Sequence, residues 1–143
     1  MEPVIHSIVP EVSMRTFEAL VTRSPIPVLL VFTAKWCSAC KDIAPIIEEF
    51  YEALKGKVAV YNVISDTNMP MLNKFGIDGI PTLILFKAGI PYGIALGNLP
   101  LETFLEMIDN ALVAKQPIEI TPIPGFGQWY YSLKSFWGRI FRN

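Results

Sequence analysis

The stretch VLLVFTAKWCSACK, residues 28–41, decides the fold of this chain. Its first six residues, 28–33, form a continuous apolar and β-branched run, which is typical of a strand that is buried on both faces of a sheet. A helical pattern follows over 37–54, with apolar residues at helical spacing. Two cysteines, Cys37 and Cys40, therefore stand where a buried strand passes into a helix.

The remaining elements follow from the same kinds of pattern. We expect a helix over 13–22 capped by Ser13, strands over 57–64, 82–86 and 92–96, a turn over 89–91, a short helix over 69–75 and a last helix over 100–114. This alternation predicts an α/β fold with a central sheet and flanking helices. Residues 116–127 are rich in Pro and Gly, so we expect a linker between a domain over 1–115 and a tail over 128–143.

Length, composition and charge exclude several classes of protein. The 143 residues suffice for one domain with a core, and 52% apolar against 17% charged residues excludes a chain that is disordered by composition. The net charge of -1 gives no reason to expect a nucleic-acid partner. No apolar run approaches the 18 to 20 residues of a spanning helix, and residues 1–10 do not resemble a secretory signal. With only two cysteines, we expect a cytoplasmic protein.

The spacing of Cys37 and Cys40 has several chemical interpretations. A structural zinc site needs about four ligands, whereas the chain adds only His6 to the two cysteines. Covalent haem attachment needs a histidine where Lys41 stands. Two inert buried cysteines are a further interpretation, but a position directly after a strand and at the start of a helix favours dithiol–disulfide exchange. We therefore expect neither a metal nor a cofactor, and a redox-active pair.

Helix geometry predicts different roles for the two cysteines. Free N–H groups and the positive end of the helix dipole stabilise a thiolate at Cys37, and Lys35 and Lys41 add positive potential. Cys40 follows one turn later, where it can attack a mixed disulfide formed at Cys37. Trp36 offers substrate an apolar surface, or is an ordinary core aromatic residue.

With these residues in place, the chain resembles the thioredoxin family over about residues 12 to 114. The matching segments are FTAKWCSACK at 32–41, IAP at 43–45, FGIDGIPTL at 75–83, and Gly97. The resemblance implies a mixed sheet of four or five strands, a cis Ile80–Pro81 bond beside the cysteines, and thiol–disulfide exchange with protein substrates. It also implies a reductase or another dithiol protein as the electron donor. The residues then expected to bind substrate are Trp36, Gly79, Ile80, Pro81 and Gly97.

The chain departs from the family pattern around the cysteines. Val31 stands where many thioredoxins have a buried aspartate that accepts a proton from the second cysteine, and we place Val60 at the position of that aspartate's lysine partner. Ser38-Ala39 replaces the usual Gly-Pro between the cysteines. We therefore predict a slower resolving step and a reduction potential above the thioredoxin value of about -270 mV.

The tail over 128–143 is aromatic and basic and contains no acidic residue. Wound as a helix, it places its aromatic and aliphatic residues on one face and Lys134, Arg139 and Arg142 on the other. Such a helix can pack on its own domain or a second copy, dock in a partner's groove, or lie on a membrane surface. A non-enzymatic binding or chaperone module, localised by this tail, is therefore the alternative to an oxidoreductase.

Overall fold

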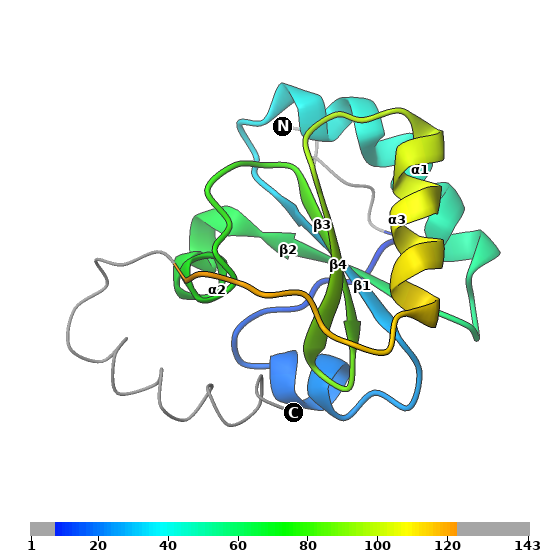
Figure 1. The fold of residues 1–143 in the computed structure, drawn as a ribbon. Coiled ribbons are helices and arrows are strands. Elements are labelled where there is room, and N and C mark those ends of the chain that lie inside the picture. Colours follow the sequence, from blue (N-terminus) through cyan, green and yellow to red (C-terminus); the bar gives the residue numbers. More distant parts are fainter. Residues whose placement is uncertain (1–7, 123–143) are drawn as a thin grey trace.

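The computed structural model describes residues 8–122 (Figure 1). The predictions for the tail over 128–143 and for the second half of the linker fall outside these residues.

A four-stranded mixed sheet forms the centre of the described chain. Its strands are β1 (Val28–Thr33), β2 (Ala59–Ile64), β3 (Thr82–Lys87) and β4 (Ile90–Leu96), in the order β2-β1-β3-β4. Strand β1 is parallel to β2 and antiparallel to β3, and β3 and β4 form an antiparallel hairpin. All six residues of β1 are buried, as their continuous apolar run predicts. The predicted α/β class and flanked mixed sheet are confirmed.

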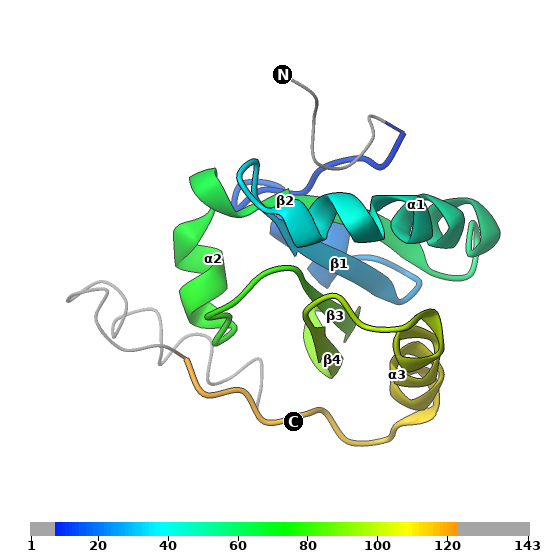
Figure 2. The same cartoon turned by 90° about the horizontal axis from the view of Figure 1, so that it is seen from above.

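Helices cover both faces of the sheet. Figures 1 and 2 show α1 (Ser38–Ala53) and α3 (Leu101–Val113) together on one side and α2 (Met69–Lys74) on the other. A short π-helix, η1 (Glu18–Thr22), belongs to the α2 side through Val21. Each face has its own buried cluster, and the cluster under α1 and α3 contains both cysteines. The start of α1, with its two cysteines, is therefore packed against this face of the sheet.

Two local elements differ from their predicted form. The helix expected over 13–22 is regular only over Glu18–Thr22, where it is π-helical, because Ser13 and Thr16 bond each other in a turn before it. The turn expected over 89–91 consists of Ala88 and Gly89, both with positive φ, 55° and 79°. Two such residues form the tight hairpin turn that matches the strand twist, so β4 begins at Ile90.

Residues 115–122, which we call the strap, leave α3 and cross to α2 in an extended path (Figures 1 and 2). The Ile118 amide donates to the Pro91 carbonyl of β4 at 3.1 Å. Ile120 packs against the cluster on the α2 side. The Thr121 carbonyl oxygen lies so close to Gly76 that a Cβ there would be 2.5 Å away. The described half of the predicted linker is therefore packed against the domain.

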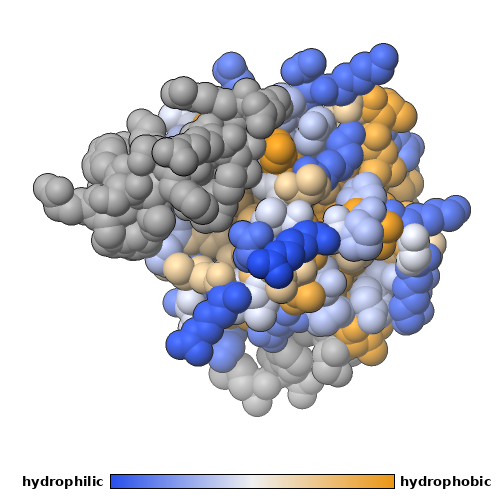
Figure 3. All heavy atoms as spheres, turned by 90° about the horizontal axis from the view of Figure 1, so that it is seen from below, coloured by the Kyte–Doolittle hydropathy of each residue, from blue (hydrophilic) through white to orange (hydrophobic). Residues whose placement is uncertain are grey.

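The surface retains part of the apolar excess of the composition. Figure 3 shows one face on which hydrophobic residues lie singly or in small groups between hydrophilic ones. The large apolar side chains exposed among the described residues are Ile8, Met14, Trp36, Met69, Ile94, Leu96, Leu101, Leu105 and Val113. Single exposed apolar residues are ordinary, so Trp36 beside the cysteines and the pair Leu101 and Leu105 on one helix are the informative cases.

Candidate active site

The cysteine pair lies at the junction between β1 and α1. Ala34, after the strand, is buried, and its carbonyl accepts a hydrogen bond from the Cys37 amide at 3.2 Å. Cys37 has an extended backbone, φ -92° and ψ 108°, and is the N-cap of α1. Lys35 and Trp36 between them are exposed. The chain therefore turns sharply out of the sheet and places Cys37 at the end of α1 where backbone N–H groups are free.

Cys37 and Cys40 are joined by a disulfide, with their Cα atoms 5.3 Å apart. The Cys40 backbone amide donates to Cys37 Sγ at 3.1 Å. The exposed fraction of the Cys37 surface is 5%, whereas that of Cys40 is 0%. Of the two cysteines, only Cys37 therefore has any exposed surface, and its sulfur is also the one that receives a helix N-terminal hydrogen bond.

Four of the predicted substrate-binding residues lie at the loop before β3. Gly79, Ile80 and Pro81 belong to this loop, and Gly97, after β4, is hydrogen-bonded to it. The Ile80–Pro81 peptide is cis, as the family resemblance implies. The Thr82 hydroxyl donates to the Gly79 carbonyl at 2.6 Å, and the Gly97 amide donates to the Pro81 carbonyl at 2.8 Å. Ile80 packs against the cluster that contains the cysteines.

Trp36 is the fifth predicted substrate-binding residue, and it reaches the site through its position next to Cys37. Its side chain is 74% exposed. A core aromatic residue would be covered, so the alternative interpretation of Trp36 as an ordinary core residue is wrong. Within the part of the chain that the structure describes, this indole beside the nearly buried Cys37 is an uncovered apolar surface.

The residues beneath the cysteines differ from the expectation at one position. Val31 is fully buried in the cysteine cluster, and the β1–β2 register places Asn62 opposite it, whereas Val60 lies opposite Leu29. The position beside Val31 is therefore Asn62, and the assignment of Val60 to it is wrong.

A buried polar pair lies there that the sequence interpretation missed. The Thr33 hydroxyl donates to Asn62 Oδ1 at 2.7 Å, and both residues are buried. Residues two apart in a strand share a face, so Val31, Thr33, Val60 and Asn62 all face α1. The sequence signal for this pair is the presence of polar residues, Thr33 and Asn62, inside the otherwise apolar strands predicted over 28–33 and 57–64. The floor of the site thus combines a valine with a neutral hydrogen-bonded pair.

Neither a metal-binding cluster nor a membrane-spanning helix occurs among the described residues. Within 8–122, no three His, Cys, Asp or Glu side chains come together in a way that could hold a metal ion. No helix in the same range has both the length and the apolar character needed to span a bilayer.

Comparison with known proteins agrees with this geometry. The family model described as Thioredoxin matches residues 8–110. Thioredoxin 1 of Nostoc sp. is 34% identical over 102 residues, which cover 71% of this chain and 95% of that protein. The thioredoxin of Synechocystis sp. is 35% identical over 106 residues, covering 74% and 99%. The thioredoxin of Rickettsia bellii is 39% identical over 99 residues, covering 69% and 94%. The strand–helix junction with its cysteine pair, the cis-proline loop and these matches together show that the chain belongs to the thioredoxin family.

Proposed function

We propose that this thiol–disulfide oxidoreductase acts on protein disulfides with Cys37 as the attacking residue and Cys40 as the resolving residue. The Cys37 thiolate attacks one sulfur of the substrate disulfide, and the other sulfur leaves as a thiolate. Cys40 then attacks Cys37 Sγ and releases the second substrate thiol. The substrate gains two electrons and the protein is left with the Cys37–Cys40 disulfide.

The asymmetry between the two sulfurs carries this assignment. Cys37 retains some exposure and accepts the Cys40 amide, which stabilises negative charge on its sulfur. Cys40 is fully buried on the first turn of α1, so an external disulfide cannot reach it. It remains within bonding reach of Cys37, which is what the resolving step requires.

An extended substrate segment would bind across the surface around Trp36 and the cis-proline loop. Trp36 supplies exposed apolar area, and the bonds of Gly79 and Pro81 hold the loop in one conformation. A rigid loop loses little entropy when substrate binds. Gly97, bonded to Pro81, would form the other side of this surface.

Insulin reduction with a dithiol donor tests the activity. The wild-type chain should accelerate precipitation of reduced insulin, and Cys37→Ser should reduce the rate to that of the donor alone. Ser38→Ala, an exposed change between the cysteines that keeps both thiols, is the matched control and should retain activity. A wild-type chain without activity would instead favour a binding or chaperone module.

The absence of a carboxylate at Val31 supports a less reducing pair than that of typical thioredoxins. Equilibration of the dithiol with glutathione buffers measures the potential, and we expect a value above about -270 mV. A value at or below that figure would rule out this part of the proposal. The electron donor would be a reductase or another dithiol protein, and the measured potential decides whether the pair acts mainly as a reductant or as an oxidant.

A cytoplasmic location and a contact of the tail with a membrane surface or a partner remain predictions. Co-sedimentation of the full chain with anionic vesicles tests the membrane contact, because the three basic residues of 128–143 should add affinity for anionic lipid. Binding that is insensitive to a Lys134→Glu/Arg139→Glu change would exclude the tail as the membrane contact.

A further inference from the structure

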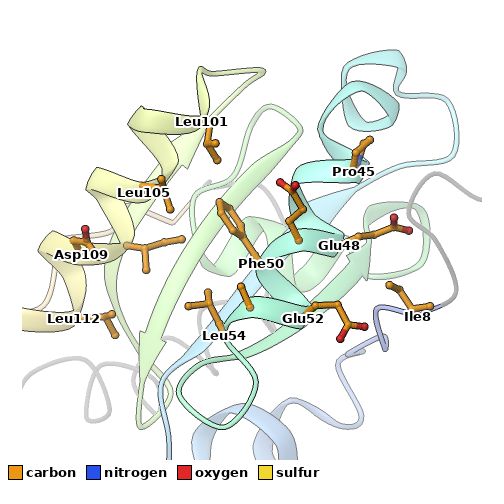
Figure 4. Close-up of a pocket in the computed structure, with 13 residues that line it drawn as sticks. Ile8, Pro45, Glu48, Phe50, Glu52, Leu54, Leu101, Leu105, Asp109 and Leu112 are labelled. Atoms are coloured by element: carbon orange, nitrogen blue, oxygen red, sulfur yellow. The ribbon is translucent and has the colours of Figure 1, made fainter.

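A groove of about 900 Å³ lies along α1 and α3, on the face of the sheet that carries the cysteines. Figure 4 shows Leu101, Leu105 and Leu112 of α3 facing Phe50 of α1 and Leu54, the residue that follows this helix. Leu101 and Leu105 are 38% and 42% exposed. The described residues, 8–122, leave this row of leucines at helical spacing partly exposed, which indicates a partner for that face outside them.

Acidic side chains surround this apolar floor. Glu48, Glu49 and Glu52 line the groove from α1, and Asp109 lines it from α3. Helix α3 carries two further acidic residues and no basic residue. The groove therefore suits an occupant with an apolar face and positive charges along its edges.

The chain itself contains a segment with these properties. Residues 128–143 have no acidic residue, and wound at about 100° per residue they place Lys134 and Arg139 near the two edges of the aromatic face, with Arg142 opposite it. A 16-residue helix would be about 24 Å long, enough to cover the groove, whose lining runs over 45–54 beside α1 and over 101–112 on α3. The apolar face and the charge of the tail are thus complementary to the groove.

The path of the strap favours a second copy over the same copy. Residues 115–122 carry the chain away from α3 to α2, on the other side of the sheet (Figures 1 and 2). Only 123–127 then precede the tail, and five residues span at most about 18 Å. Five residues cannot retrace a path for which the strap uses eight.

We propose that residues 128–143 dock as an amphipathic helix in the α1/α3 groove of a second copy of this chain. Each copy receives the tail of the other, which gives a two-fold symmetric dimer. The groove lining begins on α1 at Pro45, two turns after Cys37. The dimer therefore leaves the cysteine pair accessible to substrates.

Sedimentation velocity of the full chain at about 1 to 200 µM measures the dimer directly. A Glu49→Lys/Asp109→Lys variant places like charges between groove and tail, and a Lys134→Glu/Arg139→Glu variant does the same from the tail side. Each should weaken dimerisation about tenfold or more. An equimolar mixture of the two should form a heterodimer, because the reversed charges match only between different chains.

The controls separate this contact from general charge effects and from other occupants. Glu11→Lys/Asp66→Lys makes the same charge change at exposed positions outside the groove, and its dimerisation should equal that of the wild type. Circular dichroism and insulin reduction verify that every variant is folded. A wild type that is monomeric throughout, or a mixture that does not associate, would overturn the proposal. Monomers that bind anionic vesicles through the tail would overturn it in favour of a membrane surface.

Discussion

Val31→Asp tests whether the valine beneath the cysteines limits the resolving step. Val31 is fully buried in the cluster that contains Cys37 and Cys40, and its register partners are Asn62 on β2 and Leu83 on β3. A carboxyl at this position would lie under the pair. Once ionised, it can accept the proton that Cys40 must lose before it attacks the mixed disulfide.

The cost in stability follows from the burial of the site. Loss of a fully buried valine side chain removes about 1.5–3 kcal/mol, and a buried carboxyl without a full set of partners costs roughly 1–3 kcal/mol more. We therefore expect the free energy of unfolding to fall by about 2.5–6 kcal/mol. Burial raises the pKa of the new carboxyl, so the folded state holds its proton more tightly than the unfolded state. Stability should then fall as pH rises from about 4 through the raised pKa.

Two assays test both parts of this reasoning. Urea unfolding between about pH 4 and 8 measures the stability, and adding Asn62→Lys to Val31→Asp should restore part of it by supplying an opposite charge. Quenched single-turnover reactions followed by mass spectrometry measure how fast Cys40 clears the mixed disulfide at Cys37. We expect the carboxyl to speed this step at least about tenfold at neutral pH. An unchanged resolving rate in a folded variant would refute the role assigned to Val31.

Three further changes give sharp expectations. Burial lowers the pKa of Lys74 from 10.5 to about 6. Between these two pH values the unfolded chain binds more protons than the folded chain, so the free energy of unfolding rises with pH, by up to about 1.4 kcal/mol per pH unit. Lys74→Met should remove this rise in urea unfolding, and an unaltered rise would contradict the lowered pKa. Gly76→Ala meets both a positive φ of 68° and the Thr121 carbonyl, whereas Gly56→Ala meets a φ of 83° in open space. Gly76→Ala should therefore lower the free energy of unfolding by more than the roughly 1–2 kcal/mol that the backbone conformation alone costs. Equal losses of stability in the two variants would show that the strap is not in close contact with Gly76. Trp36→Ala, at a 74% exposed position, should leave the melting temperature unchanged and raise KM for protein substrates, and an unchanged KM would remove Trp36 from the substrate surface.

The sequence predicts the sheet well because its signals are local. The uninterrupted apolar run at 28–33 has one interpretation, a strand buried on both faces, and the structure has the strand at those residues. The hairpin is less well predicted, because Pro91 suggests a turn whereas the positive φ at Ala88 and Gly89 places it earlier. The structure accommodates Pro91 in the edge strand β4, beside a bulge between Leu85 and Phe86 of β3.

The sequence predicts the cysteine chemistry of the site but not which residues pack around the cysteines. The two cysteines follow from spacing and from their place before a helix, since the N-terminal N–H groups act within one turn. The neighbour of Val31 on β2 depends on the register between β1 and β2, which local patterns do not determine, so the sequence alone does not distinguish Asn62 from Val60 at this place. The contact between Thr121 and Gly76 is equally invisible in the sequence, because it joins a predicted linker to a helix end 45 positions away.

Trapping of the mixed disulfide tests the division of labour between the cysteines most directly. Reduced Cys40→Ser protein should form a stable covalent complex with a disulfide-bonded protein substrate, which mass spectrometry detects, through Cys37, the one cysteine that this variant keeps and the one that has some exposed surface. Reduced Cys37→Ser protein should form little or none, because Cys40 is fully buried. Equal or greater trapping through Cys40 would contradict the account.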